Sequence, residues 1–154
     1  TIKLKRMLIK LKYYGMEFNI DVNIDGTNPK LKKSIDITRV NAAKMIRQFI
    51  KQKYPKQFKS WVKSESYSGG SSINVNLCNF DGTPIDEAIY DEIETFSKSL
   101  KAGWFNGMID SYEYNESSKS DIGTLINMYT KFVFVSNEAL WGSKEYEIRK
   151  QAEA

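Results

Sequence analysis

Few side chains in this sequence could carry out catalysis. The 154 residues include no histidine and a single cysteine, Cys78, which excludes Ser-His-Asp chemistry, Cys-His chemistry and a zinc site built from several thiolates. The remaining options are a carboxylate or tyrosine acting in proton transfer, or carboxylates that hold Mg²⁺. Asp110, Tyr112 and Glu113, with the loop around Tyr67, are the residues from which such an active site could be built.

The segment that contains Asp110 also has a structural interpretation. If residues 108–114 form a strand, Asp110, Tyr112 and Tyr114 share one face. A carboxylate at that position can accept hydrogen bonds from tyrosine hydroxyls or loop amides, as buried polar groups ordinarily do. We therefore predict that the protein is not an enzyme, that it has no catalytic residues, and that it uses no cofactor and no metal.

A glycine-rich stretch, SESYSGGSS at residues 64–72, could cradle a phosphate or form the turn of a hairpin. A phosphate loop of the Walker type needs a lysine after its last glycine and a helix behind it, whereas Gly69-Gly70 is followed by serines and a strand pattern. Glycines in a tight turn adopt positive φ, so we predict a hairpin turn. If this turn, FDGTP and NGMIDSYEY meet at one end of the sheet, a recognition surface could include Tyr67, Ser68, Asp110 and Tyr112.

A basic stripe lies along the predicted helix 38–53. Lys44, Arg47 and Lys51 are spaced at i, i+3 and i+7, which places three cations on one side of a helix, as along a phosphate backbone. Trp61 follows among further lysines and could stack on a base or pack over the outer side of a sheet. Surface helices ordinarily carry such stripes, so a solvated face is the alternative to nucleic-acid binding.

The predicted helix 84–100 is acidic on its exposed side. Ile89, Ile93, Phe96 and Leu100 form its apolar stripe at i, i+4, i+7 and i+11, which leaves the carboxylates to solvent. Such a face could meet a basic surface on another protein. The acidic residues of this face are Asp86, Glu87, Asp91, Glu92 and Glu94.

Charge is distributed unevenly along the chain. Residues 1–59 hold 15 Lys and Arg against 4 Asp and Glu, while residues 60–154 hold 8 against 15. The basic part could meet phosphate or an acidic protein, and the acidic part could meet a basic groove or simply neutralise the basic part. The length fits a single domain over residues 1–154. Without a secretory signal or an apolar run long enough to span a bilayer, we expect a cytoplasmic protein with no membrane contact.

These residues must be positioned by an α+β fold. Alternating apolar residues predict strands at 17–24, 58–63, 73–78, 108–114 and 131–135, with a polar loop at 115–123. Apolar residues at helical spacing predict helices at 38–53, capped by Asp36 or Thr38, and at 84–100, capped by Thr83. A short charged helix is expected from Ser143, and residues 3–14 fit a strand or a short helix. We predict a mainly antiparallel sheet of about five strands packed with two main helices and a short C-terminal helix.

Four segments of the chain resemble a known family: KYPKQFKSWVKSESYSGGSSINVNL, FDGTP, WFNGMIDSYEY and KFVFVSNEAL. Their succession is similar to the large polyvalent protein-associated domain 29, a module of phage and conjugative-element proteins, over about residues 38–140. Asn106 stands where that family usually has Asp before the glycine. The resemblance leaves residues 1–35 outside the family as a basic extension, and it implies a mobile element in a bacterial host.

That setting implies three competing functions. The leading one is a small phage or plasmid effector that inhibits a host defence nuclease, of anti-CRISPR or anti-restriction type, by protein binding through the acidic helix or the basic N-terminal part. The alternative is a nucleic-acid-binding accessory protein that uses the basic helix 38–53. The third is an enzyme built on the Asp110 segment. The implied partner is a CRISPR effector or a restriction nuclease, and the sequence predicts no oligomeric state.

Overall fold

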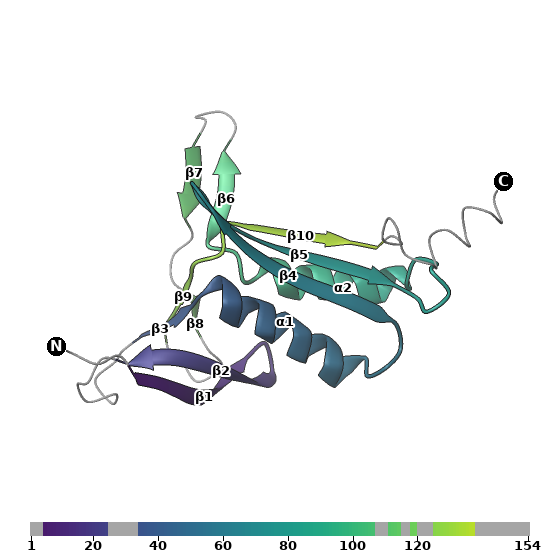
Figure 1. The fold of residues 1–154 in the computed structure, drawn as a ribbon, viewed down its shortest axis with the longest axis horizontal. Helices are drawn as coiled ribbons and strands as arrows, with labels where there is room; N and C mark the ends of the chain where they lie inside the picture. Colours follow the sequence, from purple (N-terminus) through teal and green to yellow (C-terminus); the bar gives the residue numbers. More distant parts are fainter. Residues whose placement is uncertain (1–4, 25–33, 107–110, 115–117, 120–124, 138–154) are drawn as a thin grey trace.

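The computed structural model describes residues 5–24, 34–106, 111–114, 118–119 and 125–137, drawn as ribbon in Figure 1. These ranges hold two helices and ten strands. Four strand pairings are antiparallel and two are parallel, which confirms the α+β class and its mainly antiparallel pairing. Neither described helix has the length and apolar character needed to cross a bilayer. The helix expected from Ser143 lies outside the described residues.

The chain begins with a hairpin, β1 (Lys5–Tyr13) and β2 (Met16–Ile24), so the open choice for residues 3–14 is decided in favour of a strand. Its two turn residues, Tyr14 and Gly15, have φ of 57° and 71°. Two consecutive positive φ angles match the right-handed twist of a tight hairpin. As the alternating pattern predicts, β2 buries Phe18, Ile20 and Val22 on one face.

Helix α1 (Arg39–Lys53) follows β3 (Ser34–Ile37). Of the two predicted caps, Thr38 is the one used: its Oγ1 accepts a hydrogen bond from the Asn41 backbone N–H at 3.3 Å. The helix ends before Pro55, which cannot continue it. The predicted apolar face is confirmed, since all four of its members are buried: Ala42, Ile46, Phe49 and Ile50.

The glycine-rich stretch is the hairpin turn that its sequence predicts. Strands β4 (Lys59–Tyr67) and β5 (Gly70–Cys78) pair along their whole length and leave only Ser68 and Gly69 in the turn. Both strands therefore extend several residues further than the alternating pattern indicated. Strand β10 (Phe132–Ser136) pairs with β5 in parallel, after a connection that includes the second helix.

Helix α2 (Glu87–Lys98) begins later than predicted, and its N-cap is Asp86 rather than Thr83. The Asp86 carboxylate accepts from the Ala88 N–H at 2.9 Å. Thr83 is occupied elsewhere, because Asp81 Oδ1 accepts from both its backbone N–H at 3.0 Å and its hydroxyl at 2.5 Å. An Asp two residues earlier thus holds Thr83 in a turn that precedes the helix.

The predicted single sheet of about five strands is wrong in one respect, because the strands are divided among four small sheets. The four are β1-β2, β10-β5-β4, β3-β9-β8 and β6-β7. Four of the strands that sequence patterns did not predict are short: β3, β6 (Gly103–Asn106), β8 (Ser118–Lys119) and β9 (Leu125–Met128). Strand β7 (Ser111–Tyr114) lies within the predicted strand 108–114.

One apolar core joins these pieces. Figure 1 shows α1 between the β1-β2 hairpin and the β10-β5-β4 sheet, with α2 beside it on the same side of that sheet. The rings of Phe49 and Phe96, one from each helix, are stacked with centroids 4.1 Å apart, and Phe18 of β2 stacks on Phe96 at 5.4 Å. Each fully buried phenylalanine contributes roughly 2–3 kcal/mol of transfer free energy. The N-terminal hairpin is therefore part of the same core as both helices.

Candidate functional site

The predicted basic stripe lies on α1, but its members turn to different neighbours. Lys44 Nζ lies 3.0 Å from the Asp21 carboxylate on β2. The Arg47 guanidinium donates to the Val62 carbonyl oxygen on β4 at 2.6 Å. Lys51, near the end of the helix, is exposed. The structure thus brings two of the three cations to the edges of two different strands, and phosphate binding by the stripe stays a prediction.

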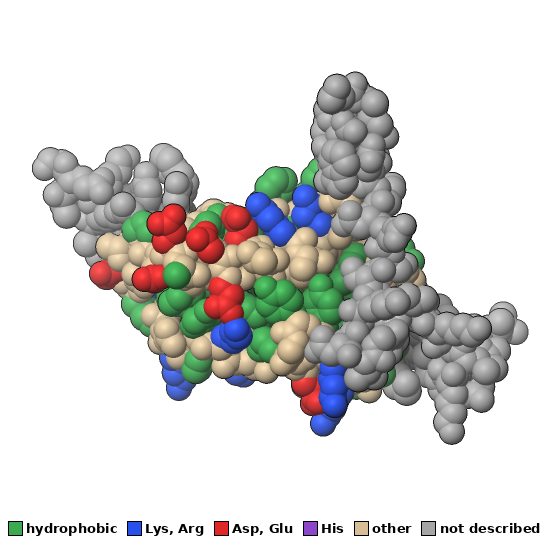
Figure 2. Space-filling model, turned by 180° about the vertical axis from the view of Figure 1, so that it is seen from behind, with side chains coloured by type: hydrophobic (Ala, Val, Ile, Leu, Met, Phe, Trp, Pro, Cys, Tyr) green, Lys and Arg blue, Asp and Glu red, His purple; other side chains and the backbone are tan. Residues whose placement is uncertain are grey.

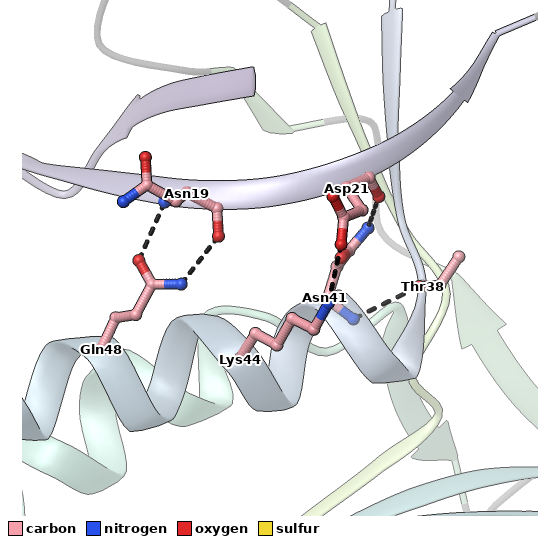
Figure 3. Close-up of polar contacts among 6 residues, drawn as sticks. All are labelled: Asn19, Asp21, Thr38, Asn41, Lys44 and Gln48. Carbon is pink, nitrogen blue, oxygen red and sulfur yellow. Dashed lines mark hydrogen bonds and ion pairs between the residues drawn. The ribbon is translucent and has the colours of Figure 1, made fainter. Parts of the chain in front are cut away.

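Amide side chains of α1 also line the free edge of β2, as Figure 3 shows. Gln48 Oε1 accepts from the Asn19 backbone N–H at 2.8 Å, and Gln48 Nε2 donates to the Asn19 carbonyl at 2.7 Å. Asn41 Nδ2 donates to the Asp21 carbonyl at 2.6 Å. Sequence analysis missed these residues, although amides at positions 41 and 48 lie two helical turns apart on one side of the helix. They occupy backbone groups that an edge strand otherwise offers to other chains.

The acidic face of α2 is confirmed as an exposed surface at three of its five residues. Figure 2 shows acidic side chains gathered over α2 on the face opposite to that of Figure 1. Asp86, Glu87 and Asp91 are exposed. Glu92 and Glu94 are half-buried and have partners within the chain. We name the three exposed carboxylates the α2 acidic face.

The two remaining carboxylates are held by tyrosines and lysines. Lys53 Nζ and the Tyr54 hydroxyl both donate to Glu92. These hydrogen bonds hold the pKa of Glu92 below its usual value, while burial and the Glu92 contact raise the pKa of Tyr54 to about 12. The carboxylate is therefore ionised and the phenol protonated at neutral pH. Neither group is poised to exchange a proton near pH 7.

Tyr90 links α2 to β10. Its hydroxyl lies 2.5 Å from Glu94 Oε2 and 2.9 Å from the Val135 carbonyl oxygen, both hydrogen-bond acceptors. The Glu94 contact, with burial, raises the pKa of Tyr90 to about 12. A groove of about 640 Å³ opens beside it, lined by Pro84, Ile85, Glu87, Tyr90, Val135, Ser136 and Asn137. The α2 acidic face thus borders a groove through Glu87.

The hairpin turn lies at the opposite end of β5 from FDGTP. Tyr67 and Ser68 are exposed at the turn, where Gly69 has φ of 93° and the Lys131 ammonium donates to the Gly69 carbonyl at 3.0 Å. A cavity of about 390 Å³ lies beneath it, lined by Ser66, Gly70, Ser71, Ala102, Met128, Tyr129 and Lys131. Because Ala102 precedes β6, the turn and the β6-β7 hairpin lie at one end of the β10-β5-β4 sheet. FDGTP follows the other end of β5, so the condition that all three segments meet at one end is not met.

The predicted partners of the turn are described only in part. Tyr112 lies in β7, where its backbone pairs opposite Phe105 of β6. Asp110 lies outside the described residues. A site formed by these two residues with Tyr67 and Ser68 therefore stays a prediction. Within the described ranges, no three Cys, Asp or Glu side chains gather closely enough to hold a metal ion.

Trp61 lies on β4 and is 38% exposed. Its neighbour in sequence, Val62, packs against the core, so Trp61 is on the outer side of the sheet, away from both helices. That position fits the second of its two interpretations, and base stacking stays a prediction. The lone cysteine, Cys78, is buried, and burial raises the pKa of its thiol, so it is protonated at neutral pH.

Comparison with known proteins gives one match. The family model of large polyvalent protein associated domain 29 matches residues 37–139. The match begins at the last residue of β3 and takes in both helices, so the β1-β2 hairpin precedes it. Searches of curated proteins and of solved structures found no match.

Proposed function

The chain belongs to the large polyvalent protein associated domain 29 family, and we propose that it is a non-catalytic effector that binds and inhibits a host defence nuclease. The family is associated with large polyvalent proteins of mobile elements, whose hosts defend themselves with CRISPR effectors and restriction nucleases. In the proposed complex, the α2 acidic face takes the place of nucleic-acid phosphates in a basic groove of the nuclease. Complementary charge of this kind guides association and selects partners.

The exposed state of the three carboxylates is the observation that carries the proposal. Within the described residues, no lysine or arginine forms an ion pair with Asp86, Glu87 or Asp91, whereas Glu92 and Glu94 each have one. Glu87 and Asp91 are four residues apart and so lie on the same side of the helix, about 6 Å apart along its axis. The helix thus presents a row of negative charge with which no cation of the described residues pairs.

The groove beside the α2 acidic face offers a binding site for a side chain of the partner. Glu87 lines it together with the aromatic ring of Tyr90 and the apolar side chains of Pro84 and Ile85. A lysine or arginine combines an apolar stem with a charged head, so it could lay its stem on these residues while its charge meets Glu87. Anchors of this kind in a pocket supply most of the energy of protein interfaces.

Two contacts weigh against the alternative in which α1 binds nucleic acid. Lys44 pairs with Asp21, and Arg47 donates to the Val62 carbonyl. A phosphate would have to compete with the first and break the second. Catalysis has no support in the described residues either, because the tyrosines with raised pKa values stay protonated near neutral pH.

A pull-down with charge-reversed variants tests the proposal. The tagged full chain is incubated with bacterial host lysate, and captured proteins are identified by mass spectrometry after nuclease treatment removes bridging nucleic acid. We expect a CRISPR effector or restriction nuclease among them. The Glu87→Lys/Asp91→Lys variant should lose this protein, while Glu17→Lys, which reverses an exposed charge on β2, should retain it.

Inhibition is then measured with the purified nuclease and its nucleic-acid substrate. We expect the chain to slow cleavage, and we expect added substrate to overcome the inhibition because the two compete for one groove. Capture of only the nucleic-acid fraction, or equal capture of a nuclease by wild type and the double variant, would overturn the proposal.

A further inference from the structure

The β10-β5-β4 sheet has one covered face and one open face. Ile73, Val75 and Leu77 of β5 are buried against the helices, and Val133 of β10 joins them. Side chains alternate along a strand, so the residues between these point to the other side. Figure 1 shows both helices on a single side of this sheet, while on its other side the β6-β7 hairpin rises only at the end where the β4-β5 turn lies.

Aromatic side chains stand on the open face. Trp61 and Tyr67 of β4 are 38% and 46% exposed, and Phe134 of β10 is 56% exposed. The ring of Phe132 lies beside that of Phe134, with centroids 6.3 Å apart and planes 10° from parallel. Scattered exposed aromatics are ordinary, but these four lie on one face of one three-stranded sheet.

The strand between these aromatics carries amides. Asn76 of β5 pairs opposite Trp61 on one side and Ser136 on the other, and the Ser136 hydroxyl donates to Asn76 Oδ1 at 3.1 Å. Asn74 likewise lies between Lys63 and Phe134. Both asparagines are half-buried. Strands are about 4.8 Å apart and rise about 3.4 Å per residue, so Trp61 and Phe134, two strands across and two residues along, are held roughly 12 Å apart with hydrogen-bonding groups between them.

The charge of the open face is positive. Lys59 and Lys63 lie on β4 on the same side as Trp61, and the stem of Lys131 covers Gly70 at the hairpin end. Glu65 is the single carboxylate that the described strands place on this face, and it pairs with Lys63 at 3.1 Å. The surface therefore suits a polyanion with flat, hydrogen-bonding groups.

We propose that this open face binds single-stranded nucleic acid. Bases stack on Trp61 and Phe134, and the amides of Asn74 and Asn76 meet base edges. Lys63, whose side chain is 76% exposed, exchanges its contact with Glu65 for a backbone phosphate. A duplex keeps its bases stacked within itself and cannot offer them to separated rings, whereas an unpaired strand can splay them across a sheet. A protein partner suits the face less well, because lysines and asparagines interrupt its apolar surface.

This inference is independent of the proposed function. The α2 acidic face belongs to a helix that packs on the inner side of the same sheet, so the two surfaces lie on different sides of it, and the groove beside Glu87 reaches the open face only at Ser136 on the β10 edge. A single strand and a basic protein could therefore be bound at once. Loss of one activity should leave the other intact.

Fluorescence anisotropy of the full chain tests the inference. The probes are labelled 12-nucleotide oligo(dT) and oligo(U), which separate DNA from RNA, and a 12-base-pair duplex. We expect both single strands, or one of them, to bind more tightly than the duplex. Trp61→Ala and Phe134→Ala should each weaken binding about 5- to 150-fold, since stacking contributes ~1–3 kcal/mol per base.

The control is Phe80→Ala. Phe80 is 56% exposed, as Phe134 is, but it lies beyond the end of β5, in the segment that leads to α2, so its loss should leave affinity unchanged. Lys63→Gln should lower the salt dependence of binding by about one phosphate contact. The inference is overturned by the absence of single-strand binding at low salt, by duplex binding of equal strength, or by equal losses in Phe80→Ala and Phe134→Ala. Unchanged melting temperatures for the four variants verify that each is folded.

Discussion

The side-chain amide of Gln48 on α1 forms hydrogen bonds with both backbone groups of Asn19 on β2, accepting from the N–H and donating to the carbonyl. It thus takes the place that a neighbouring strand would have in a sheet. Gln52 continues the row, donating to the Glu17 carbonyl at 3.1 Å. Unpaired strand edges invite pairing with other chains, so α1 both packs against the N-terminal hairpin and closes its edge.

Replacing Gln48 with glutamate should destabilise the protein at neutral pH. The carboxylate can still accept from the Asn19 N–H, but it has no proton to donate and repels the Asn19 carbonyl. A net hydrogen bond contributes about 0.5–1.5 kcal/mol, so we expect the free energy of unfolding to fall by about 1–2 kcal/mol. Urea denaturation at pH 7 measures the change.

Two comparisons make this test specific. Gln57→Glu alters an exposed glutamine in the same way and should change the unfolding free energy by less than about 0.5 kcal/mol. At pH 3 the new carboxyl at position 48 is protonated and can donate again, so the deficit relative to wild type at the same pH should shrink. If the loss of unfolding free energy is as large at pH 3 as at pH 7, the pair of hydrogen bonds between Gln48 and Asn19 is not its cause.

Arg47 and Lys51 should behave differently although both belong to the predicted basic stripe. Arg47→Met removes the donor to the Val62 carbonyl, which lies at an exposed strand edge where water can replace part of the bond. We expect a loss of about 1 kcal/mol in unfolding free energy, and less than about 0.5 kcal/mol for the matched Lys51→Met. If Arg47→Met and Lys51→Met instead cause equally small changes in unfolding free energy and equal losses of nucleic-acid affinity, the results would favour a stripe that binds phosphate.

Those elements with a strong apolar period were predictable from sequence. Phe18, Ile20 and Val22 mark β2, and the buried side of α1 follows from residues at i, i+4, i+7 and i+8. The short strands β3, β8 and β9 hold two to four residues, too few for a period to register. The pairing of β3 with β9 joins segments about ninety positions apart, such as Ile37 with Met128, which local patterns cannot predict.

The candidate surfaces were predictable where they depend on one helix and not where they depend on neighbouring elements. Exposure of Asp86, Glu87 and Asp91 follows from the helical period alone. The different contacts of Lys44 and Arg47 depend on which strands flank α1, and no spacing within the helix contains that information. The open face of the β10-β5-β4 sheet was missed because its aromatic residues come from strands more than sixty residues apart in sequence.

Acid should weaken the link between α1 and α2 at Glu92. Its folded-state pKa is lowered by Lys53 and Tyr54, so the ionised carboxylate stabilises the fold above the unfolded-state value near 4.5, and this stabilisation is lost as pH falls through the folded-state pKa. We expect the wild type to lose stability more steeply than Glu92→Gln between pH 6 and pH 3. Thermal unfolding across this range measures both curves.

The matched control for this test is Glu87→Gln, which removes an exposed carboxylate of the same helix with no ion pair among the described residues. Its melting temperature should fall with decreasing pH as steeply as that of the wild type. If the difference in melting temperature between Glu92→Gln and the wild type stays constant down to pH 3, the contacts with Lys53 and Tyr54 do not stabilise the ionised form of Glu92.

The adjacent glycines of the β4-β5 turn should respond to alanine for different reasons. Gly69 has φ of 93°, where a Cβ is strained whatever the space around it, so Gly69→Ala should cost about 1–2 kcal/mol. At Gly70 a Cβ would come within 2.9 Å of Lys131 Cδ, and a flexible lysine stem can move aside. Gly70→Ala should therefore cost less than about 1 kcal/mol, chiefly through loss of the Lys131 contact with the Gly69 carbonyl.

A double-mutant cycle separates these two causes. In a Lys131→Ala background the stem is absent, so Gly70→Ala should cost almost nothing there, while Gly69→Ala should keep its full cost because backbone strain does not involve Lys131. Chemical denaturation of the six proteins gives both coupling energies. A Gly70→Ala cost that persists without Lys131 would mean that position 70 needs glycine for its backbone, as position 69 does, and the close approach of the lysine would not explain it.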